Sequence, residues 1–363
     1  MSEPIRVCFI SLRAYPLFRP EVEAIFGGAE VDLYLLATEL AKDAAFDVRC
    51  VVADYGQPAT ETIQQVKLYK SLDTAKNLFL GGRKLWRALR QADAQVYMSE
   101  ACSLGTALHA YFCRKHDRKF VYRTAHTREC DGTYFQSHPR RALAVRWAFR
   151  QADVLLTQND EDAENLRRTT QLDSKVIRNG IRLVKAEQPK EDVILWVARS
   201  ATIKHPERFV QLARELPEMK FTMVCPRAEG DFQYESFVNE AESVANLQFI
   251  QGASYQDIGT FFERARVFVC TSDQEGFPNT YVQACQSVTP IVSLHVNPDD
   301  FLHRNQCGFC ANGDWQVFAD TVRKVMDTDL GAAWGVNARR YVEKNHDITR
   351  IIEEYKTIFR ELA

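Results

Sequence analysis

The strongest constraint on the fold of this chain is the regular alternation of short apolar runs with longer stretches of helical periodicity. Such alternation predicts parallel sheets covered by helices. The expected strand cores, such as VILWVA and KFTMVC, are almost entirely apolar, which indicates cover on both faces. We expect strands at 5–10, 47–52, 64–68, 94–99, 119–124, 153–157, 175–177, 193–198, 220–225, 247–251, 267–271, 290–293 and 308–311. We expect helices at 28–43, 74–92, 102–116, 138–151, 160–170, 206–216, 231–244, 255–265, 277–287, 298–305 and 314–327, and a helical tail from 331 with a break near 345–347.

The length predicts two domains, because 363 residues exceed what one hydrophobic core usually serves. The polar segment 178–191, which holds Gly180 and Pro189, separates two complete series of strands and helices. We therefore expect an N-terminal domain over 1–182 and a C-terminal domain over 183–346. The last expected helix, 347–363, is one more than the second sheet needs.

The composition excludes several classes of protein. A net charge of −2 gives no overall basic excess, so we expect no nucleic-acid partner. No apolar run approaches the roughly 18–20 residues that cross a bilayer, and the chain begins with a strand rather than a signal peptide. The ten cysteines lack disulfide spacing, and the single CxxC at Cys307 and Cys310 lacks the second pair of a zinc site. We expect a cytoplasmic protein.

The charge is unevenly distributed along the chain. Region 76–150 holds 15 Lys and Arg against five acids, so it carries about +10. In its first helix the cations Lys76, Arg83, Lys84, Arg87 and Arg90 alternate with Leu78, Phe79, Leu80, Leu85, Trp86 and Leu89. Three interpretations stay open: a surface for anionic lipids, a solvated helix whose apolar face packs on its own sheet, and a site for a polyanionic acceptor.

Open parallel sheets bind ligands at the carboxyl ends of their strands, so polar residues that follow the strands are candidates. Gly27 and Gly28 open a helix, where close backbone approach and free N–H groups favour phosphate; a plain helix cap is the alternative. Arg199 and Lys204 follow the strand at 193–198 and together suit a diphosphate, although such cations are also common in exposed loops. Neither GxGxxG nor GxxxxGKS/T occurs, which argues against a dinucleotide cofactor or a P-loop.

A third candidate is EGFPN, which follows the strand at 267–271. Glu275 can accept hydrogen bonds from sugar hydroxyls, and Gly276 lets the backbone come close to a ligand. Pro278 stiffens the turn before a helix whose first amides, at Asn279 and Thr280, favour an anion. The alternative is a loop followed by a capped helix.

Two further motifs contain residue types that are common in active sites. His126 follows the strand at 119–124, where it can contact a reacting phosphate or hydroxyl, or lie in a solvated loop. Asp160-Glu161-Asp162 has the DxD spacing of metal-dependent sugar transferases. It follows Asn159 at a helix start, however, where acids simply complement the helix dipole. His and Cys do not cluster at ligand spacing, so we expect no metal site.

Taken in chain order, these motifs resemble the family 4 retaining glycosyltransferases of the GT-B fold. The resemblance covers nearly the whole chain and rests on GGAE at 27–30, RNGI at 178–181, the pair Arg199 and Lys204, EGFPN at 275–279, VNPDDFL at 296–302 and GFCANGD at 308–314. It implies an α/β fold of two Rossmann-like domains whose parallel sheets face across a cleft. The helix at 347–362 would cross back to the first domain.

The resemblance also implies residue roles. Arg199 and Lys204 would neutralise the donor diphosphate, assisted by the amides of Gly28, and His126 matches the histidine near the transferred sugar. Glu275 would hold the sugar hydroxyls beside the backbone of Gly276, Phe277, Pro278, Asn279 and Thr280. Gln283 takes the place of the second acid of the E-x7-E motif, which holds the ribose. Its amide still accepts a hydrogen bond, but the loss of charge weakens that bond by about 1 kcal/mol.

We therefore expect a metal-independent retaining hexosyltransferase of polysaccharide biosynthesis that needs no cofactor. It would move a sugar from a nucleotide-diphosphate sugar to a hydroxyl of a glycan, lipid-linked or small-molecule acceptor. Region 76–150 would give peripheral contact with the inner face of the membrane. Three alternatives stay open. The first is a non-catalytic relative or partner subunit, which Gln283 suggests. The second is a nucleotide-sugar epimerase, which would need more acids and bases than His126. The third is a membrane-surface structural protein, which would bind liposomes and no nucleotide.

Overall fold

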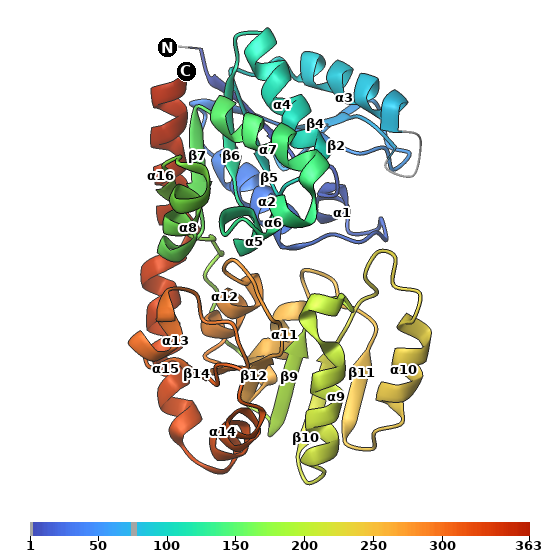
Figure 1. Ribbon diagram of the computed structural model, residues 1–363, viewed down its shortest axis with the longest axis vertical. Coiled ribbons are helices and arrows are strands. Elements are labelled where there is room, and N and C mark those ends of the chain that lie inside the picture. The colour runs from blue at the N-terminus through green and yellow to red at the C-terminus, as the bar shows by residue number, and fades with distance from the viewer. Residues whose placement is uncertain (1–2, 74–77) are drawn as a thin grey trace. The chain divides into compact units, whose positions relative to one another are not determined.

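The computed structural model describes residues 3–73 and 78–363 of the chain (Figure 1). The chain divides into two compact units. Unit 1 comprises Met1–Arg182 and Ile348–Ala363, and unit 2 comprises Leu183–Asp347. Each unit has its own sheet and its own hydrophobic core.

Unit 1 is built on an eight-stranded sheet in the order β3-β4-β2-β1-β5-β6-β7-β8, in which every neighbouring pair except β3 and β4 is parallel. Its strands are β1 (Ile5–Ile10), β2 (Phe46–Val52), β3 (Thr60–Ile63), β4 (Val66–Lys70), β5 (Val96–Glu100), β6 (Lys119–Arg123), β7 (Val154–Thr157) and β8 (Lys175–Val176). Its helices are α1 (Tyr15–Phe18), α2 (Gly28–Leu40), α3 (Leu78–Ala92), α4 (Leu104–Lys115), α5 (Thr127–Cys130), α6 (Thr133–Ser137), α7 (Pro139–Gln151), α8 (Asp160–Thr170) and α16 (Ile348–Leu362). The strand order reverses between β1 and β5, so the loops after these strands lie where such sheets bind ligands.

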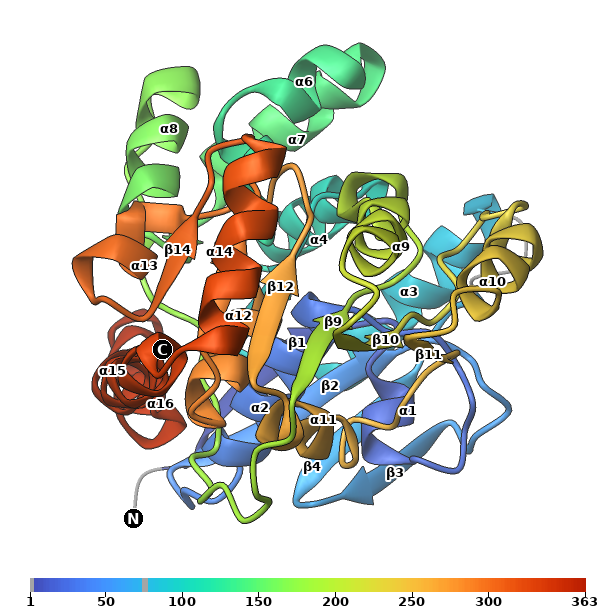
Figure 2. The ribbon, with the colours of Figure 1, turned by 90° about the horizontal axis from the view of Figure 1, so that it is seen from below.

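Unit 2 is built on a six-stranded, fully parallel sheet in the order β11-β10-β9-β12-β13-β14. Its strands are β9 (Val193–Val197), β10 (Lys220–Val224), β11 (Leu247–Ile250), β12 (Val267–Cys270), β13 (Ile291–Ser293) and β14 (Gly308–Cys310). Its helices are η1 (Thr202–Lys204), α9 (Pro206–Glu215), α10 (Tyr234–Glu242), α11 (Ile258–Arg264), α12 (Asn279–Gln286), η2 (Pro298–Asp300), α13 (Phe301–Arg304), α14 (Trp315–Asp327) and α15 (Leu330–Asn345). Figure 2 shows α9, α10 and α14 along one face of this sheet and α11 and α12 along the other.

The predicted α/β class with two Rossmann-like parallel sheets is confirmed. The last helix, α16, packs in unit 1: its buried residues include Tyr355 and Phe359, and the Phe359 ring meets the edge of Phe9 in β1 at 6.2 Å. The sequence analysis missed the short strand β3 and predicted one strand at 64–68. The structure instead has an antiparallel hairpin that turns at Gln64 and Gln65, with φ values of 49° and 65°. Two positive φ values usually call for Asn or Gly, so this turn has no recognisable sequence signal.

The RNGI segment is attached to unit 1. The Asn179 side chain accepts a hydrogen bond from the Arg123 guanidinium at 2.5 Å, and the Ile348 amide donates to the Ile181 carbonyl at 3.0 Å. A Cβ on Gly180 would lie 2.3 Å from the end of the Ile348 side chain, so any larger residue would displace that side chain from the start of α16. The motif therefore joins the exit of unit 1 to its returning helix.

Arg123, at the end of β6, is the buried cation of unit 1 that holds this junction, with only 1% of its side chain exposed. Its guanidinium pairs with Glu100 at 2.8 Å and with Asp32 of α2 at 3.1 Å. Burial raises the pKa of Glu100 well above its usual range, and the charge of Arg123 opposes that rise. One guanidinium therefore offsets the charge of two buried carboxylates.

We predict that Arg123→Met destabilises unit 1 by about 3–5 kcal/mol at neutral pH, because it leaves two buried carboxylates without their cation. The loss should shrink in mild acid. An acid whose pKa is raised in the folded state keeps its proton there to higher pH than in the unfolded chain, so stability falls as pH rises between the two pKa values. Thermal unfolding of the wild type and of Arg123→Met at neutral pH and in mild acid measures the loss of stability. Adding Glu100→Gln should recover part of the loss, and wild-type stability of Arg123→Met at neutral pH would contradict the account.

Candidate functional site

Arg199 and Lys204 lie in the loop that leaves β9, at the carboxyl end of the unit 2 sheet. The loop is anchored beside Arg199, because the Ser200 hydroxyl donates to Asp231 at 2.5 Å and the Ser200 amide donates to the Pro226 carbonyl at 3.0 Å. Arg199 itself is half-buried. Within the described residues its guanidinium makes no hydrogen bond or ion pair.

Glu275 lies in the loop that leaves β12, the neighbour of β9 in the sheet. The Lys204 ammonium forms an ion pair with the Glu275 carboxylate, and 22% and 11% of the two side chains are exposed. Sequence motifs that are 71 residues apart are thus joined, as expected for loops that follow adjacent parallel strands.

Hydrogen bonds hold these two loops together. The buried Trp196 indole donates to the Thr271 hydroxyl at 2.8 Å, and that hydroxyl donates to the Lys204 carbonyl at 2.7 Å. The Asp273 amide donates to the Ile203 carbonyl at 3.0 Å. The backbone on which Lys204 is carried is therefore fixed against the loop that carries Glu275.

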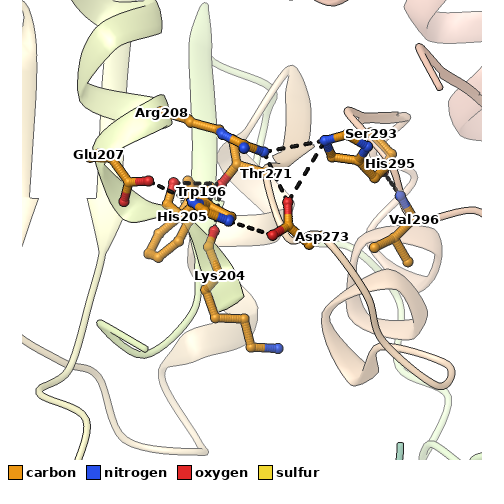
Figure 3. A network of polar contacts seen from close by, with 10 residues as sticks. All are labelled: Trp196, Lys204, His205, Glu207, Arg208, Thr271, Asp273, Ser293, His295 and Val296. Carbon is orange, nitrogen blue, oxygen red and sulfur yellow. Dashed lines mark hydrogen bonds and ion pairs between the residues drawn. The ribbon is translucent and has the colours of Figure 1, made fainter. Parts of the chain in front are cut away.

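His205 and Asp273 form a second link between the same loops, which the sequence analysis missed (Figure 3). The His205 ring nitrogens lie 2.6 Å from Glu207 and 2.6 Å from Asp273. Only the imidazolium carries a proton on both nitrogens, so only the charged ring donates to both carboxylates. His205 adopts the left-handed conformation, with φ 47°, which costs roughly 1–2 kcal/mol and redirects the chain into α9.

The Asp273 carboxylate also accepts a hydrogen bond from the Arg208 guanidinium at 3.1 Å. Burial alone would raise the pKa of Asp273, but the hydrogen bond from His205 and the charges of His205 and Arg208 outweigh it and lower that pKa. Burial and the nearby Arg208 lower the pKa of His295, whose Nε2 lies 3.2 Å from the Arg208 guanidinium. Figure 3 shows the Lys204 side chain pointing away from this network.

The EGFPN motif continues into α12. Pro278 is the N-cap residue of this helix, so the amides of Asn279 and Thr280 are its first N–H groups. Gly276 is buried. The Phe277 ring, 4% exposed, packs against Tyr281, Phe301, Tyr341 and His346. Phe277 therefore anchors the motif in the core.

Gln283 lies in the second turn of α12 and is half-buried. Among the described residues its side chain makes no hydrogen bond. The adjacent residues Val282 and Ala284 are buried, so α12 is held against the core and Gln283 lies at the edge of the buried face of the helix.

The remaining candidates lie in unit 1. Helix α2 begins at Gly28 with Gly27 as its N-cap residue, and the Gly27 amide donates to the Glu30 carboxylate at 2.7 Å. His126 is the N-cap residue of α5, and its Nδ1 accepts a hydrogen bond from the Arg128 amide at 3.2 Å. In a neutral ring this acceptor role leaves the proton on Nε2.

Glu129, three residues after His126, is a buried acid that the sequence analysis did not single out. Its carboxylate accepts from the Tyr122 hydroxyl at 2.6 Å and from the Cys102 amide at 3.2 Å. Burial raises the pKa of Glu129 to about 7, although the bonds from Tyr122 and Cys102 oppose the rise. Through the hydrogen bond from Cys102, Glu129 links the segment after β6, which carries His126, to the loop after β5.

The other sequence motifs have structural roles. Asn159 caps α8 by accepting from the Asp162 amide at 2.7 Å, and Asp160 pairs with Arg178 at 3.3 Å. In α3, Leu85 and Leu89 are buried in the unit 1 core. The cations Arg83, Lys84, Arg87 and Arg90 are exposed. Lys76 lies outside the described residues, and the side chains of Leu78, Phe79 and Leu80 are not described. Among the helices described, none is both long and apolar enough to cross a membrane.

Comparison with known proteins gives matches for both units. Residues 26–185 match the family model of Glycosyltransferase Family 4, and residues 178–345 match that of Glycosyl transferases group 1. CapM of Staphylococcus aureus, a capsular polysaccharide biosynthesis glycosyltransferase, is 25% identical over 138 residues, which are 36% of this chain and 36% of CapM. The match thus spans about a third of that relative.

Solved structures share the fold along the whole chain. Sucrose-phosphate synthase from Thermosynechococcus elongatus has a TM-score of 0.79 at 16% identity, with 99% of each chain covered. An E. coli trehalose-6-phosphate structure bound with UDP-2-fluoro glucose has a TM-score of 0.73 at 13% identity. A trehalose-6-phosphate synthase structure, from work on enzymatic glycosyltransfer with retention, has a TM-score of 0.73 at 14% identity. Both matches cover 99% of each chain. The chain therefore has the GT-B fold of glycosyltransferases, with a match to the Glycosyltransferase Family 4 model in its N-terminal half and a match to the Glycosyl transferases group 1 model in its C-terminal half.

Proposed function

We propose that the chain transfers a sugar from a nucleoside-diphosphate sugar to an acceptor hydroxyl, with unit 2 as the donor domain and unit 1 as the acceptor domain. The observation that carries the proposal is the convergence of Arg199, Lys204, Glu275 and the start of α12 on the loops after the adjacent strands β9 and β12. The UDP-2-fluoro glucose bound in the E. coli trehalose-6-phosphate structure supports a sugar nucleotide as donor.

The leaving group explains the cations. When the sugar bond breaks, negative charge develops on the nucleoside diphosphate, and groups already aimed at that position stabilise it without reorganisation. Arg199 supplies a planar fork of donors and Lys204 a point charge, while the Asn279 and Thr280 amides add the positive end of a helix dipole. In this proposal these groups do the work that a metal ion does in other transferases, so the reaction is metal-independent and needs no cofactor.

Glu275 would hold the sugar. Its carboxylate accepts hydrogen bonds from ring hydroxyls, and the backbone of Gly276 and Phe277 lines the same loop. Gln283, in the second turn of α12, would accept a hydrogen bond from a ribose hydroxyl. These roles follow the E-x7-E pattern of the family that the sequence resembles, with an amide at its second position.

Unit 1 would contribute His126 and the α2 N-terminus at Gly27 and Gly28. His126 would lie near the transferred sugar, as in the family that the sequence resembles. We propose retention: the acceptor attacks from the leaving-group face and a phosphate oxygen takes its proton. The work on retention in trehalose-6-phosphate synthase and the capsular role of CapM support this mechanism and a glycan or lipid-linked acceptor.

Region 76–150 carries the proposed membrane contact. Because the apolar residues Leu85 and Leu89 of α3 are buried in the core, the exposed face of this helix is basic. Such a face attracts an anionic lipid surface or a polyanionic acceptor through charge alone. The contact would therefore be peripheral and weakened by salt.

A thermal-shift screen of UDP-, GDP- and ADP-sugars tests the donor site. A matching donor at ~100 times its Kd should stabilise the protein by about 2.7 kcal/mol. Arg199→Ala should abolish most of that shift, because the diphosphate loses its bidentate partner, yet unfold at the wild-type temperature without ligand. A full donor shift in Arg199→Ala would contradict the assignment of this site. A shift without any donor hydrolysis or transfer by the wild type would indicate a non-catalytic relative.

Gln283 can be tested by restoring the acid that the family has at this position. If its side chain holds the ribose, Gln283→Glu should leave donor affinity unchanged or tighten it by up to about tenfold, because a carboxylate accepts hydroxyl protons more strongly than an amide. Titration calorimetry with the donor found above measures the change. Loss of donor binding in a variant that still folds would mean that this face of α12 does not meet the ribose.

Two variants of His126 separate a catalytic role from helix capping. His126→Ala should cost about 1 kcal/mol of stability, since it removes the N-cap acceptor, whereas His126→Asn retains one. If His126 contacts the transferred sugar, both variants should lower kcat at least tenfold with the donor KM little changed. Wild-type turnover in His126→Asn would assign the histidine to capping alone.

A further inference from the structure

The Lys204–Glu275 ion pair joins two groups that the proposed function assigns to different parts of one substrate. Lys204 is assigned to the diphosphate and Glu275 to the sugar, yet without substrate each neutralises the other. With 22% and 11% of their side chains exposed, both are partly withdrawn from water. Separating the pair therefore costs more than it would at a fully exposed surface.

The contact follows from the fold rather than from chance side-chain rotamers. The Thr271 hydroxyl binds the Lys204 carbonyl at 2.7 Å and the His205 carbonyl at 3.0 Å, and the Asp273 amide binds the Ile203 carbonyl at 3.0 Å. His205 adds its 2.6 Å contact with Asp273. The two loops thus present Lys204 and Glu275 to each other on fixed backbones.

We infer that this pair makes the site discriminate between a nucleoside-diphosphate sugar and the free nucleoside diphosphate. The inference rests on the proposed function and deepens it. A free nucleoside diphosphate draws the Lys204 ammonium toward its phosphates and gives the Glu275 carboxylate nothing in return. A sugar nucleotide draws the same ammonium, but its sugar hydroxyls donate to the carboxylate and replace the lost interaction.

The pair also promotes product release. Once the sugar has moved to the acceptor, the hydroxyls that satisfied Glu275 leave with it. The carboxylate then competes with the diphosphate for Lys204, so the spent nucleotide is held less firmly than the donor. One ion pair thereby couples the presence of the sugar to the strength of phosphate binding.

A double-mutant cycle tests the inference, with the Kd of the free nucleoside diphosphate and of its sugar nucleotide measured by calorimetry. Glu275→Gln should tighten the free nucleotide about threefold or more, because Lys204 is released. The same change should weaken the sugar nucleotide several-fold, because a charge-assisted bond to the hydroxyls is lost. The two ligands thus respond in opposite directions, which a merely structural role for Glu275 would not produce.

The same change in a Lys204→Met background separates the effect of the ion pair from general repulsion between the Glu275 carboxylate and the phosphates. There, Glu275→Gln should no longer tighten the free nucleotide. Glu240→Gln is the matched control, since it also removes a carboxylate that pairs with a cation in unit 2, Arg214 at 3.0 Å, and it should change neither Kd.

Two results would overturn the inference. One is equal tightening of the free nucleotide by Glu275→Gln in both backgrounds, which would mean simple repulsion. The other is weakening of both ligands by Glu275→Gln. If neither nucleotide bound the wild type at all, the proposed function would fail as well, so the two failures are distinguishable.

Discussion

Strands β9 and β12 pair side by side, and the rest of the candidate site depends on that pairing. The register sets Ile194 against Val267 and Leu195 against Phe268, so both strands end at the same edge of the sheet. At that edge the buried Trp196 indole donates to the Thr271 hydroxyl, which in turn donates to the carbonyl of Lys204. A residue after one strand thereby meets a residue after the other, and Lys204 faces Glu275 on a backbone that the core holds in place.

Charge is arranged differently around Arg123 in unit 1 and around Asp273 and Glu275 in unit 2. In unit 1 the cation Arg123 is buried between two carboxylates and serves the junction and the returning helix. In unit 2 the cations Lys204, at the end of η1, and Arg208, in α9, are partly exposed, so a ligand can compete for them. Burial makes the first arrangement structural, whereas partial exposure leaves the second exchangeable.

The sequence predicted the fold class, most of the elements and the segments that form the candidate site, because buried parallel strands and Gly-Pro punctuation have strong local signals. The alternation of strands and helices alone did not predict that the loops after β9 and β12 are neighbours, since strand order is decided by packing between distant segments; only the family resemblance assigned Arg199, Lys204 and Glu275 to one donor. For the same reason His205 and Asp273 were missed, although each lies within two residues of a predicted site residue. The Gln64–Gln65 turn was missed because neither residue type favours positive φ. Phe277 was assigned to the site from its motif, while its ring completes an aromatic cluster that forms only in the folded chain.

The most direct measurement is a crystal structure of the chain with its nucleotide sugar. The account predicts that the diphosphate lies within about 3 Å of the Lys204 ammonium and the Arg199 guanidinium, that Lys204 has left Glu275, and that sugar hydroxyls donate to the Glu275 carboxylate. A nucleotide sugar bound with its diphosphate away from both cations, and with the Lys204–Glu275 pair intact, would contradict it.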